Sequence, residues 1–252
     1  QAQAKRELLQ LGFCATEIEK LWQPLDKQYF TKRSISSIVW RTQKILTAQS
    51  VNNREHNIVV GIRSTPQKSG NEVFVYSKDQ DNLFAALTTT LDQLGLSIQA
   101  ANIYTDRSGY CYDSFIVLDE KGQALNSQSL KLTIKQSIIE NISDTNNMNL
   151  SVQRRMPRQF KYFSIPTEVE FFDDEYTGFT RMELVARDQA GFLAAIGKAF
   201  MRTKTRIHDA RISTLGEKVE DTFIISNRDN SPIANEQQRE IIRNEIKRQL
   251  NK

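Results

Sequence analysis

Residues 73–117 read VFVYSKDQDNLFAALTTTLDQLGLSIQAANIYTDRSGYCYDSFIV, and residues 182–225 read MELVARDQAGFLAAIGKAFMRTKTRIHDARISTLGEKVEDTFII. The two stretches align over their whole length, with a difference of one residue in a single turn. Asp79-Gln80 falls opposite Asp188-Gln189, and Asp113-Ser114-Phe115 falls opposite Asp221-Thr222-Phe223. Matches in this order indicate an internal duplication, so we expect two copies of one module.

Each copy predicts the element order β-α-β-β-α. In the first copy, residues 73–77 are rich in β-branched and aromatic residues, which favours a strand. Apolar residues recur at helical spacing over 83–94, and residues 98–105 alternate before a turn into 112–118, as in a hairpin. A last helix is expected over 126–142. The second copy repeats this ending after an asparagine, which is a common helix cap.

A further candidate strand precedes each copy. These strands are residues 57–63 (NIVVGIR) and residues 168–172 (EVEFF). Polar loops that contain glycine, 65–70 and 173–178, join them to the strands that follow. We therefore predict an α+β protein in which a β-hairpin opens each module.

The chain outside the two copies is helical at the start and irregular in the middle. Trp22, Tyr29 and Trp40 are the expected core residues of the helical part. The stretch between the modules is polar, basic and without periodicity, which is typical of a linker. The predicted parts are a helical region over 1–50, a first module over 57–142, a linker over 143–165 and a second module over 166–252.

Composition favours a soluble cytoplasmic protein. Apolar residues make up 39% of the chain and charged residues 25%, which is ordinary for a globular protein. No apolar run is long enough for a membrane span, and the N-terminus lacks the features of a secretory signal. Cys14 and Cys111 have no spacing that indicates a disulfide framework or a zinc site. Because the sequence begins at Gln1, we expect it to be a piece of a longer protein.

The turn between the first strand and the first helix of each module is the best candidate for a binding site. It reads DQDNLF over 79–84 and DQAGFL over 188–193. A helix N-terminus offers unpaired N–H groups to a carboxylate, and Gly191 permits a positive φ. Asn82 can keep the same turn. The aspartate that opens each loop can bind an ammonium group, so the loops suit a small zwitterion; the alternative is that the aspartates only cap their helices.

This loop pattern resembles that of the ACT domain, a regulatory amino-acid-binding module of ferredoxin-like βαββαβ topology. The tandem copies, with DTFII at 221–225 and ARISTLGEKVED at 210–221, resemble the C-terminal ACT pair of the bifunctional uridylyltransferase/uridylyl-removing enzymes that act on nitrogen regulatory protein PII. Trp40-Arg41 departs from the Trp-His expected there. Residues 1–50 look like the end of the hydrolase-domain region of those enzymes in Leu21-Trp22, Asp26, Tyr29-Phe30 and Ile38-Val39-Trp40.

The resemblance implies a glutamine site in each module. Asn82 replaces the usual glycine in the first copy, and Lys204 stands where the first copy has Gly95, so the equivalence of the two sites stays open. The implied ligand-binding residues are Asp79, Gln80, Asp81, Asn82, Leu83, Asn102 and Ile103 in the first module, and Asp188, Gln189, Ala190, Gly191, Phe192, Arg211 and Ile212 in the second.

The resemblance also implies the role of the parent enzyme, with L-glutamine as its effector. Low glutamine would favour transfer of UMP from UTP to PII, and high glutamine would favour removal of UMP by a phosphodiesterase-type hydrolysis. The catalytic domains would precede Gln1 and use Mg²⁺. This segment would hold no catalytic residue, metal or cofactor of its own and would bind neither nucleic acid nor membrane. Self-association through the ACT domains stays open.

Catalysis within this segment finds little support in the sequence. Asp173-Asp174 lacks the glycine-serine phosphate loop that nucleotidyl transfer requires, and a solvated turn is the better interpretation. His208-Asp209 spells the dipeptide of the HD hydrolases, but His56 is the only other histidine. A surface or capping role is therefore the better interpretation of that pair.

Two functions of other classes stay open. Ferredoxin-like sheets also bind RNA, through aromatic residues on the central strands. The first copy has Phe74, Tyr76 and Phe115 there, but the second has Glu183 and Val185 opposite the first two. The other alternative is a docking pair that binds no ligand.

Overall fold

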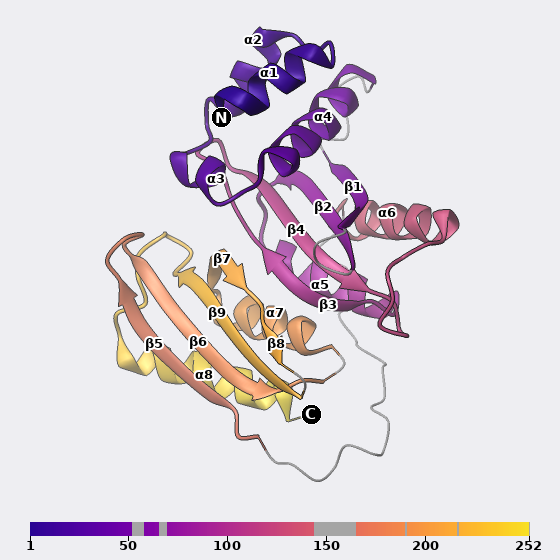
Figure 1. Ribbon diagram of the computed structural model, residues 1–252. Helices are drawn as coiled ribbons and strands as arrows, with labels where there is room; N and C mark the ends of the chain where they lie inside the picture. Colours follow the sequence, from indigo (N-terminus) through magenta and orange to yellow (C-terminus); the bar gives the residue numbers. More distant parts are fainter. Residues whose placement is uncertain (52–57, 66–69, 144–164, 190, 216, 252) are drawn as a thin grey trace.

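The structure, a computed structural model, describes residues 1–51, 58–65, 70–143, 165–189, 191–215 and 217–251. Four helices come first and lie together at the N-terminal end of the molecule (Figure 1). They confirm the predicted helical region. The helices are α1 (Ala2–Gln10), α2 (Ala15–Trp22), α3 (Lys27–Thr31) and α4 (Ile35–Val51).

Two α/β units follow. Apart from the short β8 of the second unit, both have the element order ββαββα, which confirms the duplication. None of the helices in the described ranges is both long and apolar enough to cross a bilayer. The first unit comprises β1 (Val59–Thr65), β2 (Gly70–Lys78), α5 (Leu83–Gln93), β3 (Ser97–Asn102), β4 (Tyr110–Leu118) and α6 (Gln128–Ser143). The second unit comprises β5 (Glu168–Asp174), β6 (Phe179–Arg187), α7 (Phe192–Thr203), β7 (Arg206–Arg211), β8 (Thr214–Leu215), β9 (Lys218–Ser226) and α8 (Glu236–Leu250).

The two sheets are antiparallel and have the same strand order, β1-β2-β4-β3 and β5-β6-β9-β7, with the short β8 beside β9. The strand that opens each hairpin was predicted as an addition to a βαββαβ module, and this is wrong. It pairs with the next strand and forms the sheet edge that the last strand of a βαββαβ module would occupy. Within the described residues, the first sheet takes no strand from after α6, and the second sheet takes none from after α8.

A bulge at the same point of both sheets shows how closely the copies correspond. The register of β3 on β4 shifts between Ile98 and Ala100, and that of β7 on β9 shifts between Ile207 and Asp209. A bulge bends its strand and redirects the side chains around it. The alignment that places His208 opposite Gln99 is therefore preserved in three dimensions.

The helices of both units share one hydrophobic core. Helix α5 packs against α7, and β3 lies next to β7, so the units meet through equivalent elements (Figure 1). Gly197 lies at the helix contact, where an added Cβ would come within 2.7 Å of the Ala85 Cα. The main cluster of buried apolar residues runs through both units without a break. This close approach fixes the position of the second unit beside the first.

The N-terminal helices cover the other face of the first sheet. A second apolar cluster joins Tyr29 and Ile38 of the helices to Phe74, Tyr76 and Tyr112 of the sheet. Phe74 is 0% exposed and Tyr76 is 6% exposed. The aromatic residues that suggested RNA binding are thus core residues, and they are not available for base stacking.

A buried ion network lies between α4 and the first sheet. Arg41 donates to Glu72 at 2.6 Å and to the Ser114 hydroxyl at 2.8 Å, and Arg63 binds the other oxygen of Glu72 at 2.6 Å. Burial raises the pKa of Glu72, but the two arginines outweigh this effect and hold it below its ordinary value. Glu72 therefore stays charged inside the interface between the helices and the sheet.

Candidate functional site

The two predicted loops have the same backbone conformation. Helices α5 and α7 each begin after a residue with positive φ, Asn82 at 68° and Gly191 at 72°. The prediction that asparagine keeps the glycine turn is confirmed. Neither of these residues caps its helix with a side-chain hydrogen bond. The first N–H of each helix donates to its own loop, Leu83 to the Gln80 carbonyl at 3.3 Å and Phe192 to the Gln189 carbonyl at 3.1 Å. A carboxylate ligand would therefore have to bind the N–H groups that follow in the first turn.

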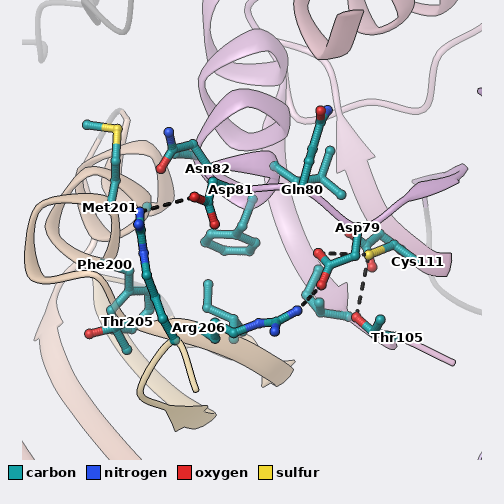
Figure 2. A pocket seen from close by; sticks show the side chains of 18 of the residues that line it. Asp79, Gln80, Asp81, Asn82, Thr105, Cys111, Phe200, Met201, Thr205 and Arg206 are labelled. Carbon is teal, nitrogen blue, oxygen red and sulfur yellow. Dashed lines mark hydrogen bonds and ion pairs between the residues drawn. The ribbon is translucent and has the colours of Figure 1, made fainter. Parts of the chain in front are cut away.

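Gln80 and Gln189 have the same structural partner in both units. Gln80 Nε2 donates to the Ile142 carbonyl at 2.8 Å, and Gln189 Nε2 donates to the Leu250 carbonyl at 3.0 Å. Each side chain ties its loop to the C-terminal end of the last helix. Figure 2 shows Gln80 turned away from Arg206. The repeated glutamine is thus explained by loop anchoring.

A cavity of about 190 Å³ lies between the loop of the first unit and the α7–β7 corner of the second. The first unit also contributes Asp113, and the second contributes Phe200, Lys204, Arg206 and Arg228. The predicted residues that line the cavity are Asp79, Gln80, Asp81, Asn82, Leu83 and Ile103.

Two ion pairs cross this cavity from one unit to the other. Asp79 pairs with Arg206, and Asp81 pairs with Arg228 at 3.2 Å (Figure 2). The other oxygen of Asp79 accepts a hydrogen bond from the Cys111 thiol at 3.5 Å. Asp79 therefore does not act as a helix cap. The cavity combines carboxylates on one wall with guanidinium groups on the other, which is the complement of an amino acid with both ends charged.

Buried carboxyl groups lie beneath both loops, at equivalent places in the two sheets. Asp113 Oδ1 accepts the Tyr104 N–H at 3.3 Å, and Asp221 Oδ1 accepts the Ser213 N–H at 3.1 Å. Burial raises the pKa of Asp113 to about 8 and that of Asp221 to about 7. Near neutral pH, the Asp113 carboxyl is therefore mostly protonated, and the Asp221 carboxyl is protonated in about half of the molecules.

Replacement of Asp113 by asparagine is expected to remove a pH dependence of stability. Because the pKa is raised from 3.8 to about 8, the folded state holds the proton more tightly than the unfolded state. This contribution is complete below the unfolded pKa and is lost as the pH rises through the folded pKa, by up to about 1.4 kcal/mol per pH unit. The free energy of unfolding should be measured in urea at about pH 5 and about pH 9. Relative to the wild type, Asp113→Asn should be more stable at about pH 9 than at about pH 5.

The matched control is Asp119→Asn, because Asp119 also accepts backbone N–H groups but lies in an exposed turn after β4. Its effect on the free energy of unfolding should be the same at both pH values. A pH-independent difference for Asp113→Asn would show that this carboxyl does not hold a proton in the folded state.

The remaining predicted residues that the structure describes do not line the cavity. Asn102 accepts a hydrogen bond from Arg33 at 2.8 Å, and Arg211 is exposed on β7. Phe192 and Ile212 are buried in the core of the second unit. Ala190 lies outside the described residues. The predicted second-strand contribution therefore reaches the cavity through Ile103 alone.

Lys32 and Arg33, at the end of α3, contact both units. Lys32 pairs with Asp209 of β7 at 3.3 Å, whereas Arg33 donates to Asn102 of β3. The Arg33 guanidinium also lies 4.2 Å from the centre of the Tyr29 ring. The N-terminal helices are thus attached on both sides of the boundary between the units.

His208 and Asp209 serve structural roles. The His208 ring stacks on Phe179 with 3.9 Å between the ring centres, and its Nε2 lies 2.7 Å from the Ser226 hydroxyl. Burial and the charge of Arg206 lower the pKa of His208 to about 4, so the ring is neutral. The two residues face different partners, since His208 lies against Ser226 and Asp209 pairs with Lys32.

A larger cavity, of about 510 Å³, lies between α2, α4 and the first sheet. Its walls include the stacked rings of Tyr76 and Tyr110. The Asp106 carboxylate on its rim is bonded within its own turn, to Ser108 and Tyr110. The cavity between the units has carboxylates on one wall and guanidinium groups on the other, and it is therefore the candidate site.

The fold and the cavity define the class first: a tandem pair of α/β units with a cavity lined by charged residues between them. Comparison with known proteins then narrows this class. Residues 1–44 match the family model described as "Uridylyltransferase GlnD fifth domain". The resemblance predicted from the sequence is confirmed, because the chain is similar over most of its length to bifunctional uridylyltransferase/uridylyl-removing enzymes.

Relatives from three bacteria illustrate the extent of the similarity. The enzyme of Acinetobacter baumannii (strain AYE) is 34% identical over 93% of this chain and 26% of its own length. That of Methylococcus capsulatus is 35% identical over 96% of this chain and 27% of its own length. That of Pseudomonas putida (strain GB-1) is 33% identical over 94% and 26%. The chain thus spans about a quarter of the length of these relatives.

Among solved structures, aspartate kinase from Synechocystis matches 72% of this chain and 27% of its own chain, with a TM-score of 0.38 and 14% identity.

Proposed function

We propose that this chain is the glutamine-sensing region of a uridylyltransferase/uridylyl-removing enzyme and that its two units are ACT modules. The observation that carries the proposal is the cavity between the units, with Asp79 and Arg206 on opposite walls. The ligand ammonium binds Asp79, and the ligand carboxylate binds the N-terminus of α5 and the arginine wall.

The similarity to these enzymes supports the choice of effector. In the proposed scheme, low glutamine favours uridylylation of PII and high glutamine favours its reversal. The catalytic domains, their Mg²⁺ and the contact with PII belong to the rest of the parent enzyme, which works in the cytoplasm. The signal passes through the N-terminal helices, because Lys32 and Arg33 contact both units. A ligand shifts such an arrangement only by its differential affinity for two states.

Calorimetric titration of this chain with L-glutamine, and with L-glutamate as the control, tests the proposal. We expect saturable binding of glutamine, and binding of glutamate that is weaker by about tenfold or more. The reason is that the carboxylates of Asp79 and Asp81 line the cavity and disfavour a second carboxylate on the ligand.

Equal affinity for both amino acids would contradict selective sensing. Failure of both to bind would favour the docking pair without a ligand. Asp79→Asn should weaken glutamine binding by about tenfold, whereas Asp229→Asn, in an exposed turn that it stabilises through Ser231, should not.

A further inference from the structure

The two loops are equivalent in backbone, but the walls opposite them are not equivalent in charge. Lys204, Arg206 and Arg228 face the first loop across the cavity. In the repeat alignment, the corresponding residues of the first unit are Gly95, Ser97 and Glu120. The first unit therefore has no cationic residue at any of these three positions.

The aspartate of the second loop lacks the ion pair that its counterpart makes. Asp79 is paired with Arg206, but Asp188 has no ion pair within the described residues. Beneath it, Asp221 Oδ2 is buried without a hydrogen-bond partner in that part of the chain. Burial accordingly raises the pKa of Asp188. The second loop thus has acids for an ammonium group. Arg187, which precedes Asp188, pairs with Glu217 at 3.8 Å, and within the described residues the loop faces no counterpart of Arg206.

Arg206 also occupies the place that the ligand ammonium needs. It contacts Asp79 Oδ2, and Asp79 Oδ1 is engaged by Cys111. Each oxygen of Asp79 thus already has one partner, and an ammonium group that takes the Oδ2 position displaces Arg206. The Arg206 backbone is held by β7 and by the packing of α7 on α5, so the movement is confined to its long side chain.

We propose that Arg206 of the second unit is an exchanging gate of the amino-acid site in the first unit, and that the Gly191 loop does not form such a site. The Arg206 side chain leaves Asp79 when an amino acid enters, and its guanidinium then binds the ligand carboxylate. The single site is built from both units. This inference rests on the proposed function.

The test compares L-glutamine with 4-aminobutanamide, which is glutamine without its α-carboxylate, by calorimetry on the whole chain. In Arg206→Gln, glutamine should bind about tenfold more weakly than in the wild type, because its carboxylate loses a partner. The amine should bind more tightly than in the wild type, because it no longer competes with Arg206 for Asp79. These opposite changes identify the gate, since a merely structural role of Arg206 would weaken both ligands alike and overturn the proposal.

Arg202→Gln is the matched control, because Arg202 is exposed on α7, the helix that leads into β7, and pairs only loosely with Glu245, at 3.7 Å. Neither affinity should change in this variant. If Arg206→Gln fails to fold, Arg206→Lys provides the same test: it keeps the charge but loses the planar fork, so glutamine should again weaken relative to the amine.

The loops themselves provide the second arm. The wild type should bind one glutamine per chain. Asn82→Val should abolish this binding, because valine does not tolerate the φ of 68° at this position. Gly191→Val should leave the affinity and the stoichiometry of glutamine binding unchanged. Two sites per chain, or loss of binding through Gly191→Val alone in a protein with native circular dichroism, would overturn the assignment. Absence of glutamine binding in the wild type would instead contradict the proposed function.

Discussion

Arg41→Met is expected to lower the free energy of unfolding by about 3 to 5 kcal/mol, the range observed when one partner of a buried ion pair is removed. Both side chains of the Arg41–Glu72 pair are only 5% exposed. The substitution leaves Glu72 Oε1 buried without its partner, and Arg63 neutralises the charge only from the other oxygen. Chemical unfolding in urea or guanidinium chloride measures the loss.

The double variant Arg41→Met with Glu72→Met separates the charge from the packing. Removing both partners leaves no unpaired charge in the interface, and Arg63 can turn to solvent because it stacks over the half-exposed Trp40. The double variant should recover most of the stability lost in the single variant. If it is no more stable than Arg41→Met, the loss comes from the shape of the arginine and not from the charge left on Glu72.

Gly197→Val is expected to have the next largest effect, because it pushes apart the two helices that join the units. A Cβ at this position would come within 2.7 Å of the Ala85 Cα and 3.1 Å of its Cβ, and main-chain atoms cannot yield as a flexible side chain does. Overpacking of this kind destabilises by about 1 to 3 kcal/mol. Glutamine affinity should also fall, by about tenfold, since Gly197 and Ala85 both line the proposed site.

Alanine has a higher intrinsic helix preference than glycine, which opposes the steric effect and makes Gly197→Ala a control. In an unobstructed helix, Gly197→Ala would stabilise by about 1 kcal/mol. We expect it to destabilise instead, and a gain in stability would show that α5 and α7 do not approach closely. Arg202→Val, at an exposed position of α7, reports the effect of a β-branched residue on the helix alone.

The sequence was sufficient to predict most of the fold, because the duplication doubled every local signal. Strand, helix and hairpin were each read twice, and the observed elements follow the same order in both units. The edge strands β1 and β5 were located, but their place in the sheet was misjudged. Local pattern identifies a strand, whereas its neighbours are decided by long-range pairing that spacing does not reveal.

The loop was likewise predictable, but the wall opposite it was not. Gly191 and Asn82 are residue types that adopt a positive φ readily, so the turn could be predicted from these residues alone. Arg206 and Arg228 come from the other unit, and nothing local to them indicates that they face Asp79. One signal was present in the sequence: Lys204 stands opposite Gly95, and two further basic residues stand opposite Ser97 and Glu120. The cationic wall thus lies at positions where the two copies differ, whereas the predicted binding loops lie where they agree.

Lys32 and Arg33 are joined by one peptide, yet they hold different units, through Asp209 and Asn102. If β3 and β7 travel together, both bonds are carried along and the α3 end keeps its geometry. If one strand slides past the other, the two bonds cannot both keep their lengths, so the peptide must rotate or one bond must break. The N-terminal helices therefore register only the difference between the movements of the two units, and any movement that the units share passes unnoticed.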